Sequence, residues 1–170
     1  MDRDLLVNKD LLHELKKMIS DGKNQVAQAI NVGLTATYWN IGKRINQEIL
    51  KNKRAGYGKQ IIPVLSEQLT EEFGKGFSDK NLRHMMKLNE VFPEIQIVSS
   101  LIRQLSWTHF TIIIYLKTEL EREFYAEMCR VEKWSVRRLR KKIDSMLFER
   151  TAISIKPEGF NCYTLQSYDA

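Results

Sequence analysis

The sequence between residues 24 and 53 reads NQVAQAINVGLTATYWNIGKRINQEILKNK. Its larger apolar side chains recur every three or four positions, at Val26, Ile30, Leu34, Tyr38, Ile41, Ile45 and Ile49. This spacing matches the 3.6-residue turn of an α-helix and predicts one long helix with an apolar stripe. Gly33 and Gly42 lie inside it, and each weakens a helix by about 1 kcal/mol relative to alanine. We therefore expect another helix to approach closely at both glycines.

The neighbouring segments also follow a helical period. Upstream, leucines and an isoleucine at helical spacing predict a separate first helix that ends near Asp21–Gly22. Downstream, the basic, glycine-bearing segment 52–58 is predicted to be a loop. Pro63 suits the first turn of the next helix, which is predicted to continue to Phe73.

A glycine-rich break at residues 74–76 separates that helix from another one. Ser78 is a good N-cap for a helix over residues 79–91, and Phe92–Pro93 should end it. Residues 94–105 fit a short helix or a strand equally well.

The last third of the chain contains three more predicted helices. Ser106 is expected to cap the first, and the second covers about residues 118–131 with Leu120, Phe124 and Met128 at steps of four. Ser135 is expected to cap the last one, whose predicted buried side comprises Val136, Leu139, Ile143, Met146 and Leu147. The fold class is therefore all-α, with a helical domain at 1–157 and a C-terminal tail at 158–170.

Composition points to a globular protein with a polyanionic partner. Of the 170 residues, 43% are hydrophobic, and 27 Lys and Arg against 21 Asp and Glu give a net charge of +6. The charge is +5 over residues 1–60, −3 over 61–128 and +4 over 129–170. A basic surface of this kind favours nucleic acid.

Cysteine usage and the N-terminus indicate a reducing, cytoplasmic compartment. Cys129 and Cys162 are far apart and are expected to be free thiols. Neither they nor the three scattered histidines show metal-site spacing, so no metal or cofactor is expected. The chain shows no apolar signal region and no run long enough to span a membrane.

The helix over residues 79–91 is the first candidate site. Together with the preceding helix and glycine turn it has the outline of a helix-turn-helix, whose second helix enters the major groove of DNA. At 100° per residue one face collects Lys80, Arg83, His84 and Lys87. These side chains could contact phosphates or base edges. The alternative is an ordinary solvated face of an amphipathic helix.

The helix that follows Ser135 is the second candidate. Arg137, Arg138, Arg140, Lys141 and Lys142 give it five cations in six positions, opposite its apolar side. Such a face suits a phosphate backbone, and we expect it to share one surface with the first candidate helix. The alternative is a solvated face, or one neutralised by Glu119, Glu121, Glu123 and Glu127.

Other groups of residues give weaker evidence for a function. Trp39, Trp107 and Trp134 could stack bases, but core packing is the better interpretation. His109 is expected to be a structural hydrogen-bonding residue. The triplets 14–16 and 21–23 match the acid-x-Lys element of PD-(D/E)XK nucleases only formally, because they lie on or at the end of a predicted helix. No catalytic residue is predicted.

Five motifs occur in a fixed order: YWNIGKRI (38–45), GYG (56–58), GFSDKNLRHM (76–85), LSWTH (105–109) and WSVRRL (134–139). Together they resemble the N-terminal domain of YhcG-like proteins, a bacterial family, over roughly residues 11–157. The resemblance implies a helical domain thought to bind DNA, normally followed by a PD-(D/E)XK nuclease domain. The chain ends where that domain would begin, so nuclease activity is not expected.

The resemblance and the residues together predict a DNA-binding helical module that is not catalytic by itself. The DNA-binding role falls on Lys80, Arg83, His84 and Lys87, and then on Arg137, Arg138 and Lys141. The alternative is a protein-interaction or dimerisation domain, acting as a homo-oligomer or as the partner of an intact nuclease. Its basis is the long glycine-bearing helix, which could form a subunit interface.

Overall fold

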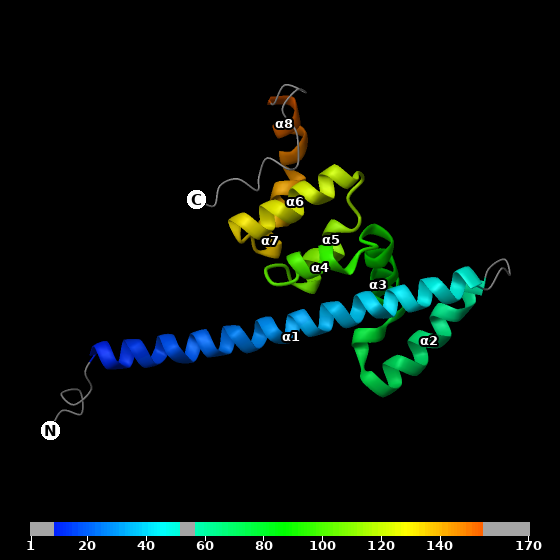
Figure 1. The fold of residues 1–170 in the computed structure, drawn as a ribbon, viewed down its shortest axis with the longest axis horizontal. Helices are drawn as coiled ribbons and strands as arrows, with labels where there is room; N and C mark the ends of the chain where they lie inside the picture. Colours follow the sequence, from blue (N-terminus) through cyan, green and yellow to red (C-terminus); the bar gives the residue numbers. More distant parts are fainter. Residues whose placement is uncertain (1–8, 52–56, 155–170) are drawn as a thin grey trace. The chain divides into compact units, whose positions relative to one another are not determined.

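The structure is a computed structural model that describes residues 9–51 and 57–154 (Figure 1). Within these ranges the chain forms eight α-helices, one short 3₁₀ helix and no strand, which confirms the all-α prediction. The helices belong to two compact units, Met1–Ile114 and Tyr115–Ala170, and each is considered by itself. None of the helices in the described ranges combines the length and the apolar character that crossing a membrane requires.

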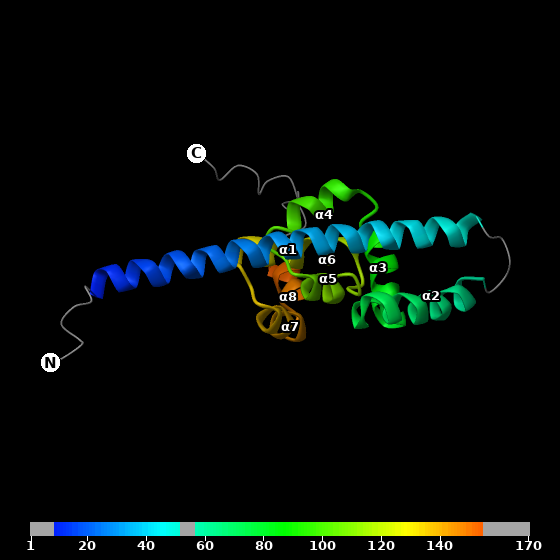
Figure 2. The same cartoon turned by 90° about the horizontal axis from the view of Figure 1, so that it is seen from below.

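Unit 1 is built on one very long helix. Helix α1 covers Lys9–Lys51 without a break, so the predicted end near Asp21–Gly22 is wrong. A single glycine costs a helix only about 1 kcal/mol, and no proline interrupts this segment. In Figures 1 and 2 the N-terminal part of α1 extends beyond the other helices of unit 1, and every residue in the range 9–30 is exposed.

The other elements of unit 1 gather at the C-terminal half of α1. They are α2 (Tyr57–Phe73), the 3₁₀ helix η2 (Lys75–Phe77), α3 (Asp79–Val91), α4 (Ile95–Leu101) and α5 (Trp107–Ile113). The predicted stripe of α1 is therefore buried only in part. Ile45 is buried, whereas Val26, Ile30 and Leu34 are exposed.

Helices α1 and α3 approach each other closely at Gly42. A Cβ atom added at Gly42 would overlap the backbone carbonyl of Met85, so the prediction of a close approach there is confirmed. It is wrong at Gly33, where an added Cβ would meet nothing within 4 Å. Beside this contact Ile45, Ile62, Leu82 and Met85 form a buried cluster.

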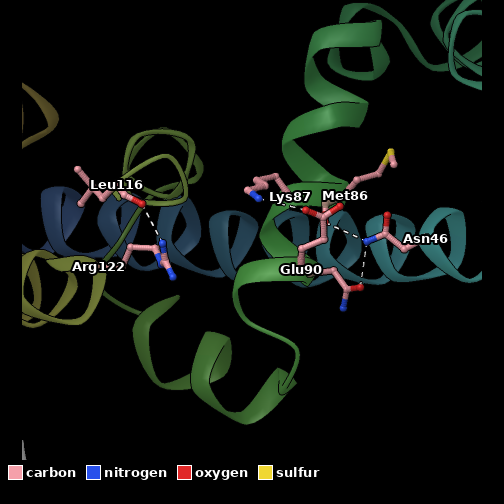
Figure 3. A network of polar contacts seen from close by, with 7 residues as sticks. Asn46, Met86, Lys87, Glu90, Leu116 and Arg122 are labelled. Carbon is pink, nitrogen blue, oxygen red and sulfur yellow. Dashed lines mark hydrogen bonds and ion pairs between the residues drawn. The ribbon is translucent and has the colours of Figure 1, made fainter. Parts of the chain in front are cut away.

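Polar side chains on α1 fix its neighbours in place. Asn46 donates from Nδ2 to the carbonyl of Met86 at 3.0 Å and to Oδ1 of Asn89 at 3.2 Å (Figure 3). Trp39 is buried, and its Nε1 donates to the carbonyl of Phe92 at 2.7 Å, just after α3 ends. These bonds hold the C-terminal half of α3 against α1.

Several predicted boundaries need correction. Pro63 lies inside α2 rather than in its first turn, because the helix begins at Tyr57. The ambiguous segment 94–105 contains the helix α4 and not a strand. Helix α3 has the predicted bounds, but the Ser78 side chain makes no capping hydrogen bond. Apart from residues 57 and 58, the predicted loop 52–58 lies outside the described residues, as do the C-terminal tail and Cys162.

Unit 2 contains α6 (Glu119–Glu132), α7 (Val136–Asp144) and α8 (Leu147–Ser154). Thr118 and Glu121 form a capping box at the start of α6, and Ser135 caps α7 by accepting from the backbone nitrogen of Arg138 at 3.3 Å. The helix predicted to follow Ser135 is divided into α7 and α8. It is interrupted at Met146, which has a φ of 52° and an exposed side chain.

The core of unit 2 centres on Tyr125. Its hydroxyl donates to the carbonyl of Lys142 at 3.3 Å and accepts from the Phe148 nitrogen at 3.2 Å, so it joins α6, α7 and α8. The buried face of α6 comprises Glu121, Tyr125, Ala126 and Cys129. This face is displaced by about one residue from the predicted set, of which Leu120 is exposed.

Candidate nucleic-acid interface

The turn before α3 is held by a side chain inside that helix. Helix α2 ends before Gly74, which has a φ of +88° that favours glycine, and η2 completes the turn. Asn81 donates from its amide to the carbonyl of Gly76 and accepts from Trp107 Nε1 at 3.0 Å. Asn81 therefore fixes the start of α3 relative to both the turn and α5. The sequence analysis missed this role, although Asn81 lies within the motif quoted above.

Helix α3 buries one face and exposes the other, as predicted. Leu82, Met85 and Leu88 are buried against the rest of unit 1. Lys80 and Arg83 are exposed, whereas His84 and Lys87 are half-buried. The four predicted residues therefore lie on the side of α3 that faces away from its buried apolar residues.

Two of these cations are paired with carboxylates of their own helix. Arg83 forms a two-pronged contact with Asp79, with Nε to Oδ1 at 2.7 Å and Nη2 to Oδ2 at 3.1 Å. This contact lowers the pKa of Asp79 below its ordinary value. Lys87 pairs with Glu90 at 3.2 Å (Figure 3). Exposed pairs of this kind are weak, so a phosphate could replace the carboxylate as partner.

His84 and Lys80 are the remaining members of this face, and of these two only His84 is half-buried. Its pKa lies below the ordinary value, first because burial disfavours the charged form and second because Lys80 is nearby. Both effects favour the neutral imidazole, which has one ring nitrogen as donor and the other as acceptor. In this form His84 can hydrogen-bond a base edge but adds no charge toward phosphates.

Helix α7 presents the second cationic face. Leu139 is fully buried, and Val136 and Ile143 are half-buried on the same side. Arg137, Arg138 and Lys141 are exposed on the opposite side, as is Arg140. The only carboxylate within α7 itself is Asp144, at its last residue. The helix therefore carries a net charge of +4.

The cations of α7 are much less neutralised than those of α3. Among the described residues the one ion pair that involves α7 joins Arg138 to Glu132 at 3.8 Å. Two of the four predicted acidic partners have other contacts: Glu127 pairs with Arg130, and Glu121 accepts from the backbone nitrogen of Lys117 at 2.9 Å. Neutralisation of this face by the acidic segment before it is not observed in the described residues.

Trp134 lies under two of these cations. Its ring is buried, with Arg138 Cζ 5.6 Å and Lys142 Nζ 5.7 Å from the ring centre. Such cation–π contacts restrict the side chains without removing their charge. All three tryptophans thus act in packing, as expected: Trp39 and Trp134 are buried, and Trp107 packs against the cluster around Ile45 and Ile62.

The described residues offer little for catalysis. No group of three or more His, Cys, Asp and Glu side chains among them could hold a metal ion. His109 is buried, and its Nδ1 accepts from the backbone nitrogen of Ser106 at 3.1 Å, which makes it part of the cap of α5. Cys129 is a buried free thiol whose pKa is raised to about 12 by burial, so it is not a nucleophile.

Comparison with known proteins places these features in a family. Residues 14–150 match the model of the DUF1016 N-terminal domain. The chain belongs to this family. The match includes both cationic helices, α3 and α7, and covers parts of both units of the structure. The DUF1016 N-terminal domain is therefore all-helical in this chain, and the resemblance to YhcG-like proteins is confirmed.

One curated relative is named for an activity. The chain is 27% identical to the protein called "Putative nuclease YhcG" of Escherichia coli (strain K12). The similarity covers 81% of this chain but 44% of the relative, so the chain spans less than half of that protein's length. No solved structure matches the chain. What is established for this chain is thus its membership of the DUF1016 N-terminal domain family and its relation to a protein named as a nuclease.

Proposed function

We propose that this chain is a DNA-binding helical module that is not catalytic by itself. The observation that carries the proposal is the outward face of α7, where Arg137, Arg138, Arg140 and Lys141 are exposed and a single ion pair at 3.8 Å is the only carboxylate contact in the described residues. A bare cationic face gains free energy by releasing the counterions of a polyanion. The printed name of the relative, a nuclease, supports DNA as that polyanion.

In this proposal α3 has a different role from α7. Its outward side chains are the exposed Arg83, which can donate to guanine, and the half-buried His84, whose lowered pKa favours the neutral form that can donate or accept. Helix α3 follows α2 and a short turn that Asn81 fixes, which supports its use as a rigid reading helix. Helix α7 supplies phosphate contacts, and α3 contributes contacts to base edges.

The proposal is tested by binding of the chain to duplex DNA over a series of salt concentrations. Each phosphate contact contributes about 0.9 to the slope of log K against log salt. Replacing Arg137 and Lys141 by Gln should lower affinity and reduce this slope by about 2. The matched control replaces Arg44 and Lys51 by Gln, since both are exposed cations on α1, and it should leave the slope unchanged.

Two results would contradict the proposal. One is the absence of binding at low salt, and the other is an equal loss of affinity in the α7 variant and in the Arg44 and Lys51 control.

The role of α3 is tested separately with Arg83→Gln, which should weaken binding to a preferred sequence more than binding to random DNA. An equal loss on both DNAs would remove α3 as the reading helix.

The non-catalytic part of the proposal has its own test. Supercoiled plasmid is incubated with the chain and Mg²⁺, and strand breaks are followed on a gel. No cleavage above a protein-free control is expected, because no metal-binding group occurs among the described residues and cleavage of the PD-(D/E)XK kind needs a metal ion to activate water. Cleavage that persists through purification and requires Mg²⁺ would refute this part.

A further inference from the structure

The last residue of α2 presents an aromatic ring to solvent. Phe73 is 60% exposed, whereas every other phenylalanine in the described ranges is buried or half-buried. Removing apolar surface from water is favourable, and an aromatic ring offers a large flat surface of this kind. A partner that covers Phe73 would therefore gain affinity.

Contacts with other rings hold Phe73 in place. Phe73 meets Phe77 edge-on, with the ring centres 5.9 Å apart. Phe77 meets Tyr38 edge-on at 6.2 Å, and Tyr38 meets Trp107 at 4.8 Å. Trp107 in turn donates to Asn81, the residue that fixes the turn before α3. Phe73 is thus the exposed end of a series of four rings in contact, and little order has to be imposed on it when a partner binds.

Two cations accompany this ring. Lys75 lies in the turn two residues after Phe73, and Lys80 lies in the first turn of α3. Both are exposed, and neither forms an ion pair within the described residues. At 100° per residue Glu71 and Glu72 lie about 160° and 100° around α2 from Phe73. The surroundings of the ring therefore favour a partner that joins a flat apolar group to a negative charge.

A nucleotide combines these two properties. Its base has faces that stack on aromatic side chains, and its phosphate is an anion that lysines bind. Asp79, the acid at the start of α3, does not oppose such a partner, because its charge is balanced by Arg83. The turn between α2 and α3 is therefore better suited to a nucleotide than to an uncharged segment of protein.

The base that contacts this ring has to be unpaired. In an intact duplex the neighbouring bases cover both faces of each base, and the grooves present only base edges. A protein ring can stack on a base that has left the helix, as at a bulge or in a single strand. Phe73 directly precedes the turn that leads into α3, so DNA bound by α3 has the ring within reach.

We propose that Phe73 stacks on an unpaired base of the DNA that α3 binds, with Lys75 and Lys80 contacting the phosphates beside that base. This inference rests on the proposed DNA-binding function and adds the class of DNA to it. The chain prefers DNA that contains an unpaired base over a perfect duplex.

The first experiment compares the affinity of the chain for two duplexes with the same ends and the same base pairs, one of which carries a single extra base. Stacking on an aromatic side chain raises affinity by about 5- to 150-fold per base, so a preference of at least about fivefold for the bulged duplex is expected. Phe73→Leu keeps an apolar side chain without the flat ring and should abolish the preference while leaving the affinity for the perfect duplex unchanged. Phe73→Trp should keep it.

A matched control removes another exposed apolar side chain from the same helix. Val64 is 52% exposed on α2, and Val64→Ala should leave the preference for the bulged duplex unchanged. An equal loss in Val64→Ala and Phe73→Leu would show a general effect on α2 and would refute stacking by Phe73.

A second experiment identifies the ring that contacts the base. The extra base is replaced by 5-iodouracil, which cross-links under long-wavelength ultraviolet light to an aromatic side chain stacked on it, and the linked residue is identified by mass spectrometry. Phe73 is expected to be that residue. The same nucleotide placed within a base pair of the perfect duplex should give no link to Phe73.

The outcomes separate this inference from the proposed function. A chain that binds neither duplex at low salt refutes DNA binding and the stacking contact together. Binding of both duplexes with equal affinity, a preference that survives in Phe73→Leu, or a cross-link to a residue other than Phe73 refutes the stacking contact alone. In those three cases the chain still binds DNA, and Phe73 is left as a surface for a protein partner.

Discussion

Replacing Gly42 by alanine should destabilise unit 1, although alanine is the better helix former. A Cβ atom at this position would overlap the carbonyl of Met85 and lie 2.9 Å from the nitrogen of Met86, which is 0.5 Å short of ordinary van der Waals contact at 3.4 Å. The obstructing atoms belong to the backbone of α3, so no side-chain rotation can relieve the overlap. Helices α1 and α3 must separate, and the hydrogen bonds from Asn46 to Met86 and Asn89 lengthen with them.

The size of the effect follows from two opposing contributions. Forcing an extra methyl group into a packed interface costs about 1–3 kcal/mol, and a rigid backbone obstacle puts this site at the upper end. Alanine gains about 1 kcal/mol over glycine in a helix. The expected net loss in the free energy of unfolding is therefore about 2 kcal/mol. Gly33→Ala is the matched control on the same helix, where open space predicts a gain of up to about 1 kcal/mol.

Urea denaturation in dilute solution, followed by tryptophan fluorescence, measures both variants. A Trp134→Phe background leaves Trp39 and Trp107 as the probes, and both belong to unit 1. The reasoning predicts opposite signs for the two glycines. If Gly42→Ala and Gly33→Ala shift the unfolding midpoint in the same direction and by the same amount, the close approach of α1 and α3 is refuted.

Three further predictions concern single buried or capping groups. Trp39→Phe leaves the buried carbonyl of Phe92 without its donor at 2.7 Å and should cost at least about 1 kcal/mol in the same assay; an unchanged midpoint would contradict this. Thr118→Ala should lose about 1 kcal/mol from unit 2, whereas Thr118→Ser keeps the capping oxygen; equal losses would exclude a capping role. Burial raises the pKa of Cys129 from its ordinary value of 9.0 to about 12. At pH 8 the folded protein should therefore contain about a thousandfold less of the Cys129 thiolate than an unfolded chain. Fast labelling of the native protein by a thiol reagent, in a Cys162→Ser chain, would disprove this. Because folding raises the pKa of this acid, its contribution to stability is complete below pH 9 and declines as the pH rises toward 12.

Local signals in the sequence predicted the ends of several helices. Helix α3 ends at the residue before Phe92–Pro93, and Ser106 and Ser135 stand directly before α5 and α7 as expected. These signals are readable because capping and proline act within one turn of the chain. The burial of Leu139 opposite the arginines of α7 was readable for the same reason, since it follows from the helical period alone.

Tertiary contacts decided what the sequence left open. Gly33 and Gly42 look alike in the sequence, yet only Gly42 lies against another helix. The sequence predicted an apolar stripe along this helix, but a helical period shows that a face is apolar and does not show what covers it. Ile30 lies between Gln28 and Asn31, which both donate to backbone carbonyls of the segment after α4, so its exposure shows that it lies on a face of α1 that unit 1 leaves uncovered.

The two cationic helices differ in a way that a count of lysines and arginines does not reveal. On α3 each of two cations has a carboxylate three or four residues away, so DNA would have to exchange Asp79 and Glu90 for phosphates there. On α7 the exposed Arg137 and Lys141 make no ion pair within the described residues, and their charge is available without exchange. Contacts made by α7 should therefore account for most of the salt dependence of binding, because it is net charge that releases counterions. Contacts made by α3 should matter more for the choice of sequence. When the Arg83 guanidinium leaves Asp79 it loses two hydrogen bonds, and a base edge with two acceptors is the DNA group that replaces both.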